Sequence, residues 1–220
     1  MFDGQERIVF SPDWITIVFL VVLILIAIIK NNFGGQLTSL FSLVYSDKYY
    51  SDFGKVKPAI WNNFNILFFF IFLLISSVMI YYALNAYVNE SFRFDFGYFL
   101  KILAGLLLFL ALRYTFEVFL SALFEIFQEY KFFSFVKISN LFLISIYLLP
   151  VLLFITYVNS SHYKIFIGAS LVLLVLLLLY RYIRALQYDR INFSNIFYLF
   201  LYLCALEIAP IILIYKLIVS

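Results

Sequence analysis

The chain has 220 residues, of which 66% are hydrophobic and 12% are charged. In a soluble domain, roughly a quarter of the residues are charged. So few polar residues cannot cover the surface of a water-soluble globule, and they exclude a disordered chain as well. The net charge of +3 without a basic stripe also excludes a nucleic-acid-binding protein. The composition therefore indicates an integral membrane protein of the all-α class.

Six stretches of the chain are apolar enough to form transmembrane helices, each of which needs about 20 residues. They are residues 14–30, 64–84, 98–120, 138–157, 165–183 and 196–217. The segments between them are too short and polar to bury a core of their own. The predicted architecture is therefore a single polytopic bundle of transmembrane helices over residues 1–220.

The longest connection between predicted spans contains a short amphipathic pattern at residues 36–45. Leu37, Leu40, Phe41 and Val44 recur at helical spacing, with polar residues between them. A helix of this kind typically lies on the membrane surface. Binding of a partner protein is the alternative interpretation.

The third span predicts an unusually long helix. Residues 98–130 contain no proline, and no glycine follows Gly105. A helix of this length would measure about 50 Å, whereas the hydrocarbon core is ~30 Å thick. We expect its far end to project from the membrane, and the alternative is a break near Tyr114 followed by an interfacial helix. The residues at the projecting end that would meet a partner protein are Ser121, Glu125 and Gln128.

Lysine and arginine residues near the span ends predict the orientation in the membrane. The first, third and fifth predicted loops hold nine of them, Lys137 included, and the opposite side holds five. This excess predicts that the three loops face the cytoplasm and that both termini face the periplasm.

Arg113, Glu117 and Glu207 are charged residues inside predicted spans, where an uncompensated charge costs about 2.5–3.5 kcal/mol. Arg113 and Glu117 are four residues apart, so they share a helix face. Arg113 and Glu207 have similar predicted depths, about 12 Å and about 16 Å from the cytoplasmic face. We expect Arg113 to pair with Glu117, Glu207 or both. The group is then either an ion pair that fixes helix docking, or a proton relay, ion site or anion site.

Two prolines inside predicted spans, Pro150 and Pro210, each remove a backbone N–H and predict a helix kink. Pro210 follows Glu207 by three residues. A kink there would either shape a pocket beside the acid or bend the helix around its neighbour.

The sequence contains no HExxH, GxSxG, P-loop or GxGxxG motif. One cysteine, Cys204, and one histidine, His162, exclude a disulfide framework and a Cys/His zinc site within one chain. We therefore expect no catalytic centre, no metal and no cofactor.

Four segments carry a family resemblance: SPDWIT before the first span, YSDKYYSDFGK in the first loop, LRYTFE in the third span and LYLCALEIAP in the last. Through them the chain resembles a family of uncharacterised polytopic inner-membrane proteins of Bacteroidota-type bacteria. The resemblance implies an inner-membrane location and no particular activity. Two of the segments contain Arg113, Glu117, Glu207 and Pro210.

The leading functional hypothesis is a non-catalytic integral membrane subunit or assembly factor of a bacterial cell-envelope complex. Its partners would be the lipid bilayer and other membrane proteins, in a hetero-oligomer. The alternative is a small transporter or proton-conducting protein that uses Glu207 and Arg113. A lipid-modifying enzyme is a third, more distant hypothesis.

Overall fold

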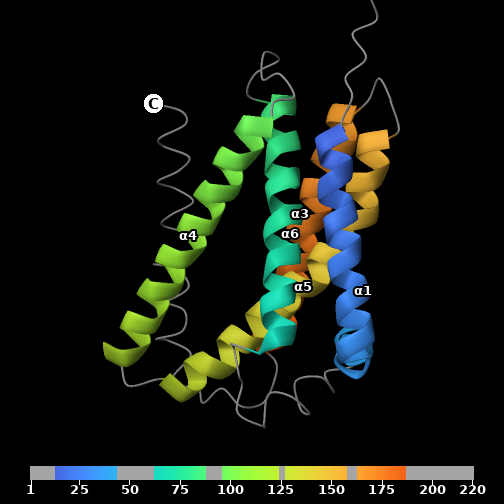
Figure 1. Cartoon of the computed structure of the whole chain (residues 1–220). Helices are drawn as coiled ribbons and strands as arrows, with labels where there is room; N and C mark the ends of the chain where they lie inside the picture. Colours follow the sequence, from blue (N-terminus) through green and yellow to red (C-terminus); the bar gives the residue numbers. More distant parts are fainter. Residues whose placement is uncertain (1–12, 44–61, 88–95, 124–126, 158–162, 187–220) are drawn as a thin grey trace, which may run out of the picture.

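A computed structural model describes residues 13–43, 62–87, 96–123, 127–157 and 163–186 (Figure 1). Every secondary-structure element among these residues is an α-helix, as the composition predicted. The helices are α1 (Asp13–Ser42), α3 (Asn63–Tyr87), α4 (Phe96–Leu123), α5 (Phe127–Tyr157) and α6 (Tyr163–Leu186).

Four helices within the described residues are long and apolar enough to cross a membrane. They are α1, α4, Asn63–Ala86 of α3 and Ser134–Tyr157 of α5, and they contain the first four predicted spans. The fifth predicted span, 165–183, falls inside α6, where a shorter apolar stretch covers Ile165–Leu177. The sixth predicted span, 196–217, lies outside the described residues.

The described part of the amphipathic helix predicted at 36–45 is helical up to Ser42 and forms the portion of α1 beyond a kink, while residues 44 and 45 lie outside the described residues. The kink is at Phe33, whose φ of −132° and ψ of 33° are not helical. Leu37 and Leu40 beyond the kink are 7% and 0% exposed, so they pack in the protein core and do not lie on lipid. The ring of Phe33 contacts that of Phe64, with centroids 5.9 Å apart, which ties the kink to the start of α3.

The long third helix predicted over residues 98–130 is wrong at its far end. Helix α4 ends at Leu123, and residues 127–130 are already the first turn of α5. Figure 1 shows α5 turning back toward the bundle from the lower end of α4. The alternative of a break near Tyr114 is also wrong, since α4 is helical through that residue. No proline or glycine marks the end of α4, which explains why the sequence pattern missed it.

Helix α3 forms the centre of the bundle and packs against α1, α4, α5 and α6. Phe68, Ile71, Ile75 and Val78 on this helix are at most 1% exposed. The ring of Phe68 stacks on that of Phe142 of α5, with centroids 5.2 Å apart. Because lipid tails are as apolar as these side chains, close packing of this kind holds membrane helices together where the hydrophobic effect cannot.

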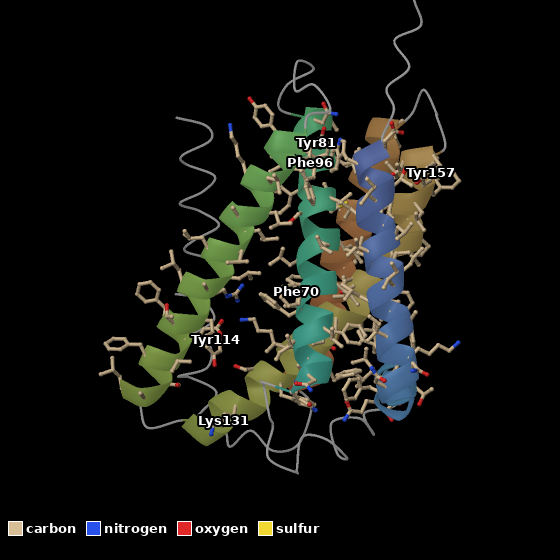
Figure 2. The ribbon with its side chains drawn as sticks, in the orientation of Figure 1. Phe70, Tyr81, Phe96, Tyr114, Lys131 and Tyr157 are labelled. Carbon is tan, nitrogen blue, oxygen red and sulfur yellow. The ribbon has the colours of Figure 1, made fainter. Side chains whose placement is uncertain are left out.

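Successive helices run in opposite directions, so the ends of α1, α4 and α6 lie toward the lower end in Figure 1 together with the starts of α3 and α5. The chain passes from the end of α1 to the start of α3 through the first predicted loop, and from the end of α4 to the start of α5 through the third. At the opposite end, Trp14 contacts the rings of Tyr81, Phe96 and Phe99 at centroid distances of 5.3, 5.8 and 5.0 Å. Figure 2 shows Tyr81 and Phe96 at this end, where α4 meets the bundle.

Candidate functional site: an ion-pair cluster between α4 and α5

Helix α4 meets α5 through a cluster of three charged residues, Arg113, Glu117 and Lys137. Arg113 Nε donates to Glu117 Oε1 at 3.1 Å, and Lys137 Nζ donates to the same oxygen at 2.8 Å. The Glu117 side chain is 8% exposed, against 22% for Arg113 and 15% for Lys137. One nearly buried carboxylate therefore accepts two charge-assisted hydrogen bonds, one from its own helix and one from the next.

The positions of these residues follow from helix geometry. Arg113 and Glu117 lie one turn apart on α4, which places both on the side that faces the bundle. Lys137 reaches them from the antiparallel α5 and joins the two helices. The predicted pair of Arg113 with Glu117 is confirmed. Charged hydrogen bonds of this type contribute about 1.5–3 kcal/mol each, and more is lost when one partner is removed from a buried pair.

The sequence prediction missed Lys137 because it assigned this residue to a cytoplasmic loop. The sequence does contain a signal that Lys137 belongs to a helix, because residues 127–149 contain no glycine or proline. In the structure α5 accordingly begins at Phe127, well before the apolar stretch. Ser134 precedes Lys137 by three residues and Asn140 follows by three. These three polar residues at helical spacing predict a polar stripe on α5, opposite the acid of α4.

The residues one turn nearer the α4–α5 connection are small and polar. Ser121 of α4 is 1% exposed, and its Oγ donates to the Val118 carbonyl at 2.8 Å. Ser134 of α5 is 4% exposed, and its buried Oγ has no hydrogen-bond partner among the described residues. Ser121 was predicted to face a partner from a projecting helix end. It is buried instead, because α5 folds back against α4.

The remaining predicted site residues have different outcomes. Glu207, Pro210 and Glu125 lie outside the described residues. Gln128 belongs to the first turn of α5, and its side chain also lies outside the described part. Helix α5 continues past Pro150 to Tyr157.

The cluster carries two positive charges and one negative charge, and Figure 2 labels two residues that are near it in the chain. Tyr114, next to Arg113 in the chain, is labelled on the lower half of α4, and Lys131 is labelled near the start of α5. The described residues contain no group of three or more His, Cys, Asp or Glu that could hold a metal ion. The chemistry of the cluster is that of ion pairing between two helices.

Comparison with known proteins identifies a family but no activity. Residues 15–218 match the family described as Domain of unknown function (DUF4271). No curated protein and no solved structure matches the chain.

Proposed function

We propose, from the premise that the chain belongs to the DUF4271 family, that it is a non-catalytic subunit or assembly factor of a cell-envelope complex in a bacterial inner membrane. In this proposal the protein works by binding another membrane protein and not by turnover of a substrate. The proposed topology has the first, third and fifth predicted loops in the cytoplasm and both termini in the periplasm.

The observation that carries the proposal is the exposure of α4. We define its outer face by Leu108, Leu112 and Phe119, which are 60%, 52% and 61% exposed. The helix is attached to the bundle by the Trp14 ring contacts at one end and by the ion-pair cluster toward the other. It thus presents a long apolar surface on a defined support.

Such a surface packs equally well against lipid tails or against another apolar helix. The aromatic ring of Phe119 offers a large contact area to a neighbouring helix. The cluster supports the proposal because its ion pairs hold α4 in a fixed position relative to α5. A fixed apolar face is better suited to recognition than a mobile one, since less conformational entropy is lost on binding.

Photo-crosslinking in native membranes tests the proposal. A photoreactive amino acid is placed at Leu108 or at Phe119, and the matched control carries it at Ile17 of α1, which is 63% exposed. We expect a discrete protein adduct from both α4 positions and lipid adducts alone from Ile17. Mass spectrometry of the adduct identifies the partner.

Lipid adducts from all three positions would contradict the proposal, as would a monodisperse monomer purified from native membranes. If that monomer moved protons or a solute in proteoliposomes, and Arg113→Ala or Glu207→Ala abolished the flux, the alternative of a small transporter would replace it.

A further inference from the structure

We propose that the partner of α4 is a transmembrane helix that carries an aspartate or glutamate, and that this carboxylate pairs with Lys101. The inference rests on the proposed function, in which the outer face of Leu108, Leu112 and Phe119 binds another membrane protein. It adds the chemistry of that partner, which is an apolar helix with one acid at the level of Lys101.

Lys101 is in line with the outer face of α4. It precedes Leu108 by seven residues, the same interval that separates Leu112 from Phe119. Seven residues make almost two complete helical turns, so these side chains lie within about 40° of one another around the helix axis. Lys101 is also exposed. A partner helix that runs along the outer face therefore passes over Lys101 as well.

The ammonium group of Lys101 has no carboxylate beside it among the described residues. Arg113 and Glu117, the other charged residues of α4, bond to each other at 3.1 Å. Lys101 Nζ instead lies over the ring of Tyr98, 5.1 Å from its centroid. Tyr98 is itself 40% exposed. An aromatic ring attracts a cation without cancelling its charge, so the outer face presents one uncompensated positive charge.

This charge selects among the helices that could cover the outer face. A wholly apolar helix would separate the ammonium group from water and from lipid headgroups and would provide no counter-charge, which is unfavourable. A helix with a carboxylate at the same level replaces the lost hydration with an ion pair. Such a pair also fixes the depth and the rotation of the partner, because complementary charges determine the register of an interface.

The position of Lys101 along α4 places the partner's acid near the membrane boundary. Lys101 follows Phe96, the first residue of α4, by five residues, or about 7.5 Å along the helix axis. At this end Trp14 contacts the rings of Phe96 and Phe99, and Figure 2 labels Phe96 and Tyr81 there. Aromatic residues at the ends of spans are typical of the headgroup level. An acid at this level reaches the headgroup region before the two proteins assemble, so the free partner tolerates it.

The middle of the outer face suits a helix as the partner element. Leu108 has four neighbours one turn away on the helix surface, namely Ala104, Gly105, Ala111 and Leu112. Three of them are small, and a Cβ atom added at Gly105 would meet no described atom within 4 Å. Small residues allow two helix backbones to approach closely. The surface around Leu108 therefore supports the close contact that would also bring an acid to Lys101.

Photo-crosslinking from Phe119 tests the charge requirement. Phe119 lies eighteen residues from Lys101, about 27 Å along the helix, so a substitution at Lys101 leaves the cross-linking site unchanged. The photoreactive residue at Phe119 is combined with Lys101→Glu, Lys101→Gln or Lys101→Arg in native membranes. Lys101→Arg is the matched control because it keeps the positive charge.

We expect Lys101→Glu to lower the yield of the protein adduct at least tenfold, roughly the effect of two like charges in contact, and Lys101→Gln to lower it about fivefold. Lys101→Arg should stay within about twofold of the parent. Equal yields from the parent and all three variants would overturn this inference and leave the proposed function intact. The absence of any protein adduct from the parent would overturn both.

Carbodiimide coupling in the same membranes tests the contact directly. The reagent activates a carboxylate and joins it to Lys101 Nζ as an amide, while the reagent takes up the elements of water and leaves as a urea. We expect a peptide in which Lys101 is linked to an aspartate or glutamate of the protein that Phe119 labels. Lys101→Arg should form the photo-adduct without this amide, since a guanidinium group does not couple. A Lys101 that faces lipid headgroups would give no such peptide, and that result would overturn the inference.

Discussion

Helices α3 and α4 are both apolar enough to cross a membrane, but they occupy opposite environments. Half of the span of α3 is buried, against 6% of the span of α4. The buried helix carries Phe68, Ile71 and Ile75 at the centre of the molecule, whereas Leu108 and Phe119 of α4 are exposed. Figure 1 shows α4 leaning away from the bundle while α3 stands within it.

The difference in burial between α3 and α4 arises because the surrounding medium is a lipid bilayer and not water. In water an apolar helix face must be buried, so hydrophobic periodicity identifies the core. In a bilayer the same face is equally stable against lipid, and burial depends on shape and on the few polar contacts. The position of α4 is therefore set by its packing on α3, by the Trp14 ring contacts and by the ion pairs of Glu117.

The largest expected effect comes from the same substitution on the two helices. Phe68→Ala should lower the free energy of unfolding by about 4 kcal/mol, because Phe68 is fully buried and stacks on Phe142. Phe119→Ala, the control on α4, should change it by less than about 0.5 kcal/mol in purified protein. Unfolding by SDS in mixed micelles measures both. Equal losses would show that α4 is as closely packed as α3.

Glu117→Gln should have the next largest effect, a loss of about 3 kcal/mol, because it leaves two cations without their shared carboxylate. Lys137→Gln and Arg113→Gln should each cost less, since either variant retains one ion pair with Glu117. The same unfolding assay ranks the three variants. If Lys137→Gln were the most damaging, the link between α4 and α5 would depend on the lysine and not on the shared acid.

The sequence predicted the features that depend on bilayer thickness or on spacing within one helix, and it missed those that depend on contacts between helices. The existence of the apolar helices was predicted because bilayer thickness fixes their length. The pair of Arg113 and Glu117 was predicted because spacing within one helix fixes a shared face. Lys137 was missed because contacts between helices depend on where each one turns, and neither Leu123 nor Phe127 is marked by proline or glycine. The burial of Leu37 and Leu40 was missed for a related reason, since the continuation of α1 past Phe33 has no clear local signal.

A glycine on α4 provides a smaller test of the comparison. A Cβ atom added at Gly105 would meet no described atom within 4 Å, so Gly105→Ala should stabilise the purified protein by about 0.5–1 kcal/mol through reduced chain entropy. The measurement is the unfolding midpoint in mixed micelles. In native membranes, a loss of partner adducts in this variant would show that another helix packs at Gly105, as small residues often permit. Destabilisation of the purified protein would mean that part of the chain itself covers this position.

The smallest expected effect concerns a hydrogen bond between α3 and α5. Tyr82 Oη and Thr156 Oγ1 are 2.8 Å apart, and Thr156 Oγ1 also donates to the Leu152 carbonyl at 2.7 Å. A hydroxyl has one proton, so Thr156 accepts from Tyr82, which must be the donor.

Because Tyr82 is the donor and Thr156 is the acceptor, substitutions at these two residues should have different effects on stability. Tyr82→Phe removes the donor and leaves Thr156 bonded to its own helix, so it should cost about 0.6 kcal/mol, the average for hydrogen bonds between membrane helices. Thr156→Val should cost more, because it leaves the hydroxyl of Tyr82, which is 6% exposed, without its acceptor. Adding Tyr82→Phe to Thr156→Val should then recover part of the loss, and Thr156→Ser should be close to neutral because it keeps the hydroxyl. If Tyr82→Phe proved the more costly single change, the direction of the hydrogen bond would be reversed.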